Sequence, residues 1–406
     1  MRLKAPNLFS MVFLAFVFWF VSNIPDWILR SGGPPPVWSY ISFLAFASLV
    51  ILIRASRYQH VFSSEQWAKS KGIWYWLLTF IFWAIFNFLY SSQSPVAFQR
   101  FITTLEMAAI FGGFILLLGY WPTSRALGFV LAFLVIMSSS INIYDFFIPT
   151  FSTVSGRAAG LYENPTISAS LLVLMTTGAL YSRKIFGRWV LLSMATVGVF
   201  LTFSRGSWVI LFITISWLFM KGYLGGYKHR LLIGFLAISS IGAISYLLLS
   251  GLLGEYIVNS PLAAYLDSNT LGRIGVGGFA TDSSANEREA VVRFAIEKFL
   301  NAPSILFGYG MGFTHEWEFK VSTHNMYLFF LVEGGVLGLL MYMSLLAVLW
   351  RSAVGIGKLI VLQIIVFSLF THNFLDSPDR IFFFAFAAMT AQMFQNSAVS
   401  GRREAK

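Results

Sequence analysis

Cysteine is absent from this chain of 406 residues, and only 11% of the residues are charged. The missing thiols exclude disulfides, thiolate metal ligands and thiol catalysis. The scarcity of charge, together with a hydrophobic share of 57% and a mean hydropathy of +0.73, excludes an ordinary soluble domain. Neither HExxH nor an Asp-rich metal pattern occurs, and we expect no metal and no cofactor.

Apolar runs fill most of the chain. About 20 residues in a helix cross the hydrocarbon layer, so the runs predict an all-α polytopic membrane protein with about twelve transmembrane helices. The first run follows Arg2 and Lys4 as in a signal peptide, but no cleavage site of small residues follows it, and we expect it to be retained. The predicted spans are roughly 8–24, 37–53, 73–90, 102–121, 126–144, 166–182, 186–203, 206–220, 231–250, 325–350, 358–375 and 380–396.

The basic residues give an orientation. If the N-terminus is cytoplasmic, 18 of the 28 Lys and Arg residues fall on the cytoplasmic side, as the positive-inside rule predicts, and the C-terminus is cytoplasmic as well. The net charge of +11 is therefore a signal of topology, and we expect membrane lipids as partners and no nucleic acid.

Three sections follow from this topology: nine spans in 1–250, a long outer loop in 251–323, and three spans with a short tail in 324–406. Inside the loop, Ser284 and Glu287 have the spacing of a capping box, and Pro303 ends the segment. Between them runs an apolar stripe of Val291, Val292, Ala295, Ile296, Phe299 and Leu300. This pattern predicts an amphipathic helix that rests on the membrane surface or caps the bundle.

The predicted outer face holds most of the conspicuous polar residues. Every even-numbered span begins at this face, so its unpaired N–H groups and positive dipole end lie there. Asn164 before Pro165 is predicted to cap the sixth span, and Ser204 or Thr323 could cap others in the same way. Such ends beside arginines predict a site for an anion, most naturally a phosphate or diphosphate. The candidate residues are Arg157, Glu163, Asn164, Arg205, Arg288, His324, Asn325 and His372.

Each candidate also has a structural alternative. Arg157 could be an interfacial anchor that pairs with Glu163, and Arg288 could pair with a loop carboxylate. Arg205 is the sharpest case, because the tight turn before it leaves its charge at the interface, where an unpaired charge is costly. His324 could merely cap its helix, and a structural role for His372 would look identical in the sequence.

Three further features are less specific. The role of Glu106, in the middle of a span, is open, because a buried carboxyl needs a partner or a proton. Glu333 is expected to brace packing around the small residues Gly334, Gly335 and Gly338. The segment GYGMG at 308–312 lacks the context of a nucleotide loop and is predicted to be a turn.

Two segments together resemble the signature of the O-antigen ligase and polymerase superfamily. They are NEREAVVRFAIEKFLNAPSILFGYGMGF and STHNMYLFFLVEGGVLGLL, in which an Arg opens a helix, Pro and Gly-x-Gly follow, and His-Asn leads into a span with an acidic residue before Gly-x-x-Gly. Two earlier pieces, GRAAGLYENPTISASLLVL and LTFSRGSW, are also similar, so the resemblance covers roughly 157–345. Val292 replaces the usual aromatic, and the stretch after Pro303 is about two residues longer than usual, which puts only local geometry in doubt.

The resemblance implies a glycosyltransferase of the bacterial inner membrane with a periplasmic active site. It would transfer O-antigen polysaccharide from an undecaprenyl diphosphate carrier to lipid A-core in lipopolysaccharide biosynthesis. His324 would be the base of an inverting reaction, and Arg205 and Arg288 would stabilise the leaving diphosphate. Arg157, Asn164, Asn325, His372 and Glu163 would contact the diphosphate or the sugar.

Other functions remain open. An O-antigen polymerase would use the same lipid-linked donor and share the motifs. A transporter of lipid-linked sugars would be expected to place ionisable groups near the middle of the bilayer, whereas here they gather at one face. The sequence leaves the donor sugars, the acceptor position on the core and the oligomeric state undetermined.

Overall fold

The computed structural model describes residues 8–58, 64–120, 124–181, 187–223, 283–318 and 323–404. Within these ranges the regular structure is helical, and no strand is formed apart from one isolated bridge between Ser304 and Gly308. The all-α prediction is thus confirmed for the described residues. Every predicted apolar run contains a helix, except 231–250, which lies outside these ranges. Within 358–375 the helix ends at Phe367, and the run 8–24 is interrupted after Val21.

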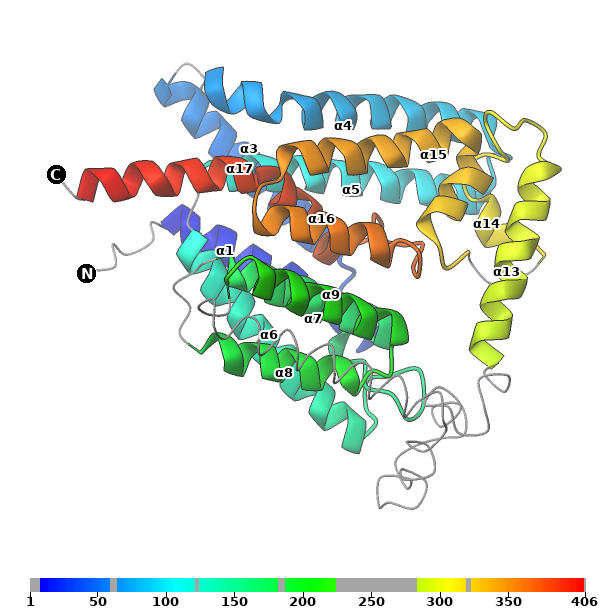
Figure 1. Ribbon diagram of the computed structural model, residues 1–406. Coiled ribbons are helices and arrows are strands. Elements are labelled where there is room, and N and C mark those ends of the chain that lie inside the picture. The colour runs from blue at the N-terminus through cyan, green and yellow to red at the C-terminus, as the bar shows by residue number, and fades with distance from the viewer. Residues whose placement is uncertain are drawn as a thin grey trace. The chain divides into compact units, whose positions relative to one another are not determined.

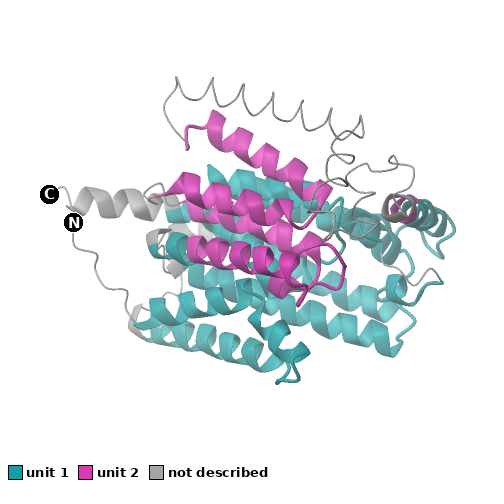
Figure 2. Cartoon of the chain, turned by 90° about the horizontal axis from the view of Figure 1, so that it is seen from below, with its two compact units in different colours: residues 1–130, 290–406 teal, residues 131–289 magenta. Residues whose placement is uncertain are grey.

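The chain divides into two compact units, which Figure 2 colours separately. Unit 1 comprises 1–130 and 290–406, and unit 2 comprises 131–289. These two units are defined by contacts in space. The three sections predicted from the sequence are defined by membrane topology along the chain, and they stay a prediction.

Unit 1 contains most of the long helices (Figure 1). α5 and α17 pack along each other, α4 lies against α5 and α15, and α1 lies against α17. The helices of this unit are α1 (Leu8–Val21), α2 (Ile24–Arg30), α3 (Val37–Tyr58), α4 (Ser64–Tyr90), α5 (Pro95–Tyr120), the start of α6 (Ser124–Phe147), most of α13 (Ser283–Leu300), α14 (Phe313–Glu316), α15 (Met326–Ser352), α16 (Ile356–Phe367) and α17 (Pro378–Glu404).

Aromatic rings hold these helices together. The ring of Phe43 lies 4.6 Å from Phe114 and 5.5 Å from Phe20, centroid to centroid, and Phe382 meets Phe114 edge-to-face at 5.4 Å. A Cβ on Gly113 would lie 2.8 Å from Phe43, so the absent side chain lets α3 and α5 approach. In a membrane the lipid tails are as apolar as the side chains, so helices associate mainly through close packing of this kind.

Length and composition support only part of the predicted membrane topology. Among the described residues, four helices are long and apolar enough to cross a membrane, and the bent pair α1 and α2 adds a fifth if it forms one span. The four segments are Ser70–Tyr90, Pro95–Gly119, Ala126–Phe147 and Met326–Ser352. Several other predicted spans form shorter apolar helices, so membrane character is supported and the number twelve stays a prediction.

α15 is broken at Gly335, whose φ of +61° and ψ of −158° are not helical. The segment before α14 repairs the break: Tyr309 and Gly310 donate their N–H groups to the carbonyls of Val332 and Glu333, at 3.0 and 2.8 Å. In return, Val336 donates its N–H to the carbonyl of Ile305 at 2.9 Å. The predicted turn at 308–312 therefore also serves as the partner of a broken helix.

Small residues make this interlock possible. A Cβ on Gly308 would lie 2.4 Å from the carbonyl oxygen of Val332, and a Cβ on Gly334 would lie 2.6 Å from the ring of Trp83. The prediction that the glycines around Glu333 allow close packing is confirmed for Gly334.

α13 confirms the predicted amphipathic helix, and it runs across the ends of α4 and α15 in Figure 1. Val291 and Ala295 are fully buried against Trp317 and Val332, so this face caps unit 1. The rest of the predicted stripe differs, because Val292, Ile296 and Leu300 are exposed. Whether this exposed flank rests on a membrane stays a prediction.

Unit 2 is a smaller bundle around α7 (Pro165–Leu180), which packs against α8 (Arg188–Phe200), α9 (Arg205–Met220) and the short helix η1 (Gly160–Tyr162). The rest of α6 belongs to it as well. α8 ends at Phe200 and α9 begins at Arg205, which confirms the predicted tight turn between them.

Replacement of Gly310 by Ala tests the interlock. Gly310 has φ +90°, and an added Cβ would lie 2.5 Å from the backbone of Ser91. Gly32 has a similar φ of +83° but open space around it, so Gly32→Ala measures the backbone strain alone. We expect Gly32→Ala to lower the free energy of unfolding by about 1–3 kcal/mol and Gly310→Ala to lower it clearly more. Equal losses in a chemical unfolding titration would contradict the interlock.

Candidate functional site

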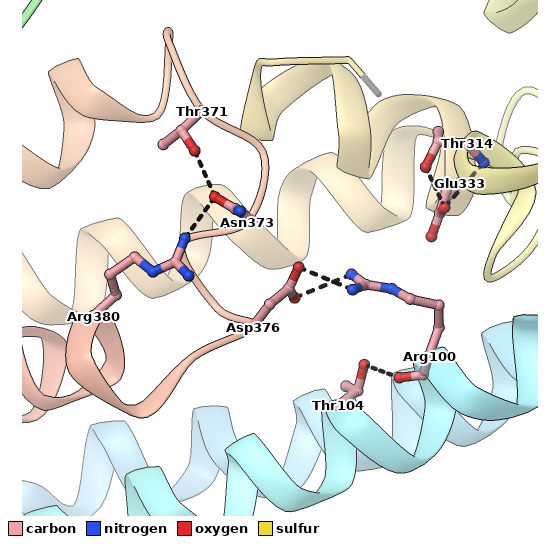
Figure 3. A network of polar contacts seen from close by, with 8 residues as sticks. All are labelled: Arg100, Thr104, Thr314, Glu333, Thr371, Asn373, Asp376 and Arg380. Carbon is pink, nitrogen blue, oxygen red and sulfur yellow. Dashed lines mark hydrogen bonds and ion pairs between the residues drawn. The ribbon is translucent and has the colours of Figure 1, made fainter. Parts of the chain in front are cut away.

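An ion pair joins the starts of two helices in unit 1. The guanidinium of Arg100, in the second turn of α5, donates two hydrogen bonds to the carboxylate of Asp376, just before α17, at 2.9 and 3.0 Å (Figure 3). The side chains are 16% and 22% exposed, and the guanidinium carbon lies 5.5 Å from the ring centroid of Phe329. A fork of this kind fixes orientation as well as charge.

The pair sets the charge state of Asp376. Burial alone would raise the pKa of this carboxyl, but the charge and hydrogen bonds of Arg100 outweigh that cost and hold the pKa below its usual range. Nearby, the side-chain oxygen of Asn373 accepts hydrogen bonds from Arg380 and from Thr371, which fixes the loop before α17 (Figure 3).

Three histidines gather beside this pair. The ring centroid of His372 lies 5.6 Å from that of His324 and 6.4 Å from that of His315, and Phe329 lies 6.4 Å from both His315 and His372. The structure thus brings His324 and His372 together, two of the residues singled out from the sequence.

The backbone at His324 is held in an uncommon conformation, with φ +48°. Asn325 follows as the N-cap of α15, because its side-chain oxygen accepts the N–H groups of Tyr327 and Leu328. Thr323 does not cap the helix as the sequence had suggested, since its hydroxyl donates to the carbonyl of Asn325. Strained backbone of this kind is found where a side chain must be aimed.

The surroundings favour the neutral form of two of these imidazoles, those of His372 and His315. Burial lowers the pKa of His372 to about 3. The charge of Asp376 opposes this shift, and His324, His315 and Arg100 add smaller lowering effects. Burial and Arg100 also lower the pKa of His315. A neutral imidazole can accept a proton, whereas a charged one cannot.

Glu333 ties the short helix α14, which carries His315, to α15. Its buried carboxylate accepts hydrogen bonds from the hydroxyl and the N–H of Thr314, at 2.6 and 3.2 Å (Figure 3). The expected bracing role of Glu333 therefore extends from helix packing to loop anchoring. Glu333, Asn87 and the Arg100–Asp376 pair also line a cavity of about 50 Å³. That is enough for a few waters.

In unit 2, Arg157 lies near the turn that precedes Arg205. Arg157 is 6% exposed, and its Nε donates to the carbonyl of Thr202 at 2.7 Å. The N–H of Ala158 donates to the carbonyl of Leu201 at 3.0 Å. The loop of Arg157 and the turn before Arg205 are thus fastened to each other, although the two arginines are far apart in the sequence.

The predicted helix caps in unit 2 turn out differently from each other. Asn164 caps α7 as predicted, because its side-chain oxygen accepts the N–H of Thr166. Ser204 occupies the N-cap position of α9, but its hydroxyl bonds to that of Ser207 and makes no cap hydrogen bond. The expected pairing of Glu163 with Arg157 stays a prediction.

The predicted site residues therefore form two groups. His324, Asn325 and His372 lie at one end of unit 1, and Arg157, Asn164 and Arg205 lie in unit 2, while Arg288 lies in α13 and is half-buried. Their convergence on one substrate stays a prediction.

Sequence reasoning missed Arg100 and His315 as site residues. Arg100 carried a usable signal: it follows Pro95 at the start of a span on the predicted outer face, where an arginine needs a partner. His315 lies directly after the Gly-x-Gly segment. Among the described residues, no group of three or more His, Asp or Glu side chains is arranged to hold a metal ion.

Residues 189–343 match the family model Wzy_C, O-antigen ligase. The match runs from α8 into α15 and includes Arg205, Arg288 and His324, whereas Arg157 and His372 lie outside it. Curated proteins give no match. The resemblance seen in the sequence is confirmed for this O-antigen ligase segment, which indicates a function of the ligase or polymerase type.

The neutral state of His372 predicts a pH dependence of stability. In the unfolded chain the pKa of His is 6.5, and in the folded protein that of His372 is about 3, so the unfolded state binds more protons between these values. The free energy of unfolding should therefore fall as the pH decreases below 6.5. His372→Gln should flatten this loss between pH 6.5 and 4.5, measured by thermal unfolding of the purified protein. An unchanged slope would contradict the assigned burial.

Proposed function

We propose that the protein transfers O-antigen polysaccharide from an undecaprenyl diphosphate carrier to lipid A-core at the periplasmic face of the inner membrane. The observation that carries the proposal is the match of residues 189–343 to the O-antigen ligase family, which contains Arg205, Arg288 and His324 in order. The lipid-linked donor and the lipid A-core acceptor are the partners that this family assignment implies.

His324 is the proposed base. It takes the proton of the acceptor hydroxyl while the hydroxyl oxygen attacks the anomeric carbon, and the bond from that carbon to the diphosphate breaks. One direct displacement inverts the anomeric configuration. The position of His324 supports this role, because the cap of α15 fixes its backbone and His372 lies beside its ring.

Arg205 and Arg288 are proposed to bind the diphosphate as its charge grows, with Arg157 and Asn164 nearby. The N-terminus of α9 begins at Arg205 and that of α7 follows Asn164, so helix dipoles add positive potential to the same end of unit 2. Preorganised donors of this kind are typically worth about 3–4 kcal/mol each in a transition state. In this proposal Asn325 and His372 position the acceptor side, and Glu163 supports the Arg157 loop.

The test replaces the base and keeps the backbone. Asn tolerates positive φ better than most residues, so His324→Asn should preserve the start of α15 and remove the imidazole base. We expect kcat for transfer to fall by about 10² to 10⁴-fold in a purified system with lipid-linked donor and lipid A-core. His60→Asn, on the predicted cytoplasmic side, is the matched control and should leave kcat unchanged. Wild-type turnover by His324→Asn would remove this residue from the mechanism.

The same assay separates the alternative functions. A ligase converts lipid A-core into a product that carries the polysaccharide. A polymerase lengthens the carrier-linked chain without using lipid A-core. A transporter yields neither product and instead moves the intact donor across vesicle membranes.

A further inference from the structure

Asp145 is a buried carboxylate that the proposed mechanism does not use. It lies in the last turn of α6 and is 1% exposed. A negative charge is unfavourable at the C-terminal end of a helix dipole, and a buried carboxylate is costly without partners. Strong compensation is therefore required at this position.

Four backbone N–H groups supply it. Oδ1 of Asp145 accepts those of Thr150 and Phe151, at 3.0 and 2.7 Å. Oδ2 accepts those of Ala159 and Gly160, at 2.8 and 3.1 Å. One carboxylate thus holds both ends of the loop 150–160, with one oxygen for each end.

The loop is also seated directly on α6. Gly160 has φ +53°, and a Cβ there would lie 2.6 Å from the side-chain oxygen of Asn142. Asn142 in turn donates to the hydroxyl of Ser168 in α7 and to the carbonyl of Gly198 in α8. Through Asn142, the loop held by Asp145 is therefore in contact with α6 and linked to α7 and α8.

This loop carries Arg157 and reaches the turn before Arg205. Between the two points held by Asp145, Arg157 donates to the carbonyl of Thr202, and Ala158 donates to that of Leu201. A shift of the loop would displace Arg157 and withdraw two hydrogen bonds from the turn that leads into α9. The positions of Arg157 and Arg205 thus both depend on this one loop.

We propose that Asp145 is a positioning residue that sets Arg157 and Arg205 for the anionic group of the donor. It touches neither the substrate nor the reacting atoms. The identity of the donor in this inference rests on the proposed function. The positioning role itself rests on the hydrogen bonds of Asp145.

The test variant is Asp145→Asn. An amide keeps one acceptor oxygen and replaces the other with an NH₂ group, which would face two N–H donors, so one end of the loop should be released. Leu174→Ala is the matched control, because Leu174 is fully buried in α7 and its truncation destabilises unit 2 without removing a loop contact.

The first measurement follows the loop itself. Because the chain has no cysteine, Ser155→Cys places a single spin label on the exposed part of the loop. Asp145→Asn should make this label more mobile, whereas Leu174→Ala should not. A label at Val209→Cys, exposed on α9, reports whether α9 itself has loosened, and its spectrum should stay the same in both variants.

The second measurement follows donor binding. Asp145→Asn should raise KM for the lipid-linked donor about tenfold with a smaller change in kcat, because misplaced binding groups weaken ground-state contacts. Leu174→Ala should lower the unfolding temperature and leave KM unchanged. An unchanged label spectrum, or a mobile loop with an unchanged KM, would overturn the inference. Absence of transfer by the wild type would instead refute the proposed function, and the label experiment would still decide the role of Asp145 in the loop.

Discussion

A backbone polar group without a hydrogen-bond partner is costly inside an apolar helical bundle, and this constraint organises the loop end of each unit. In unit 1, α15 breaks at Gly335, and the segment 305–310 supplies the missing partners. In unit 2, the loop 150–160 would leave four N–H groups unpaired near α6, and the carboxylate of Asp145 accepts all four. Irregular backbone is tolerated at Gly335 and in the loop 150–160 because specific hydrogen-bond partners are present there. Glu333 lies beside the first place and Arg157 lies in the second.

Charge is managed in the same local way. The Arg100–Asp376 pair joins α5 to the loop before α17 and lies next to three histidines, two of which have a lowered pKa. Imidazoles whose neutral form is favoured suit proton acceptance. In unit 2, Arg205 begins α9 and Asn164 caps α7, so the positive ends of two helix dipoles lie beside these residues. In the proposed function the two tasks are divided: His324 of unit 1 accepts the proton, and Arg157 and Arg205 of unit 2 bind the anionic group.

Local signals in the sequence predicted much of this. The cap at Asn164 and the tight turn before Arg205 each depend on a few neighbouring residues and are found where they were expected. The amphipathic helix also forms, but it begins at Ser283, one residue before the expected cap Ser284. Contacts between distant residues were not predicted: Arg100 and Asp376 are 276 positions apart, and nothing near either residue specifies the other. The break at Gly335 was also missed, because glycines in an apolar run equally indicate close helix packing. The exposed flank of α13 shows the same limit, since an apolar stripe does not reveal which of its residues meets a partner.

The central proposal is that the protein joins a polysaccharide from a lipid-linked donor directly to lipid A-core. The most direct measurement supplies the purified protein with both lipids and determines the anomeric configuration of the new bond by NMR. The account predicts a product on lipid A-core whose new bond has the configuration opposite to that in the donor. A product with the donor's configuration, or no product on lipid A-core, would contradict it.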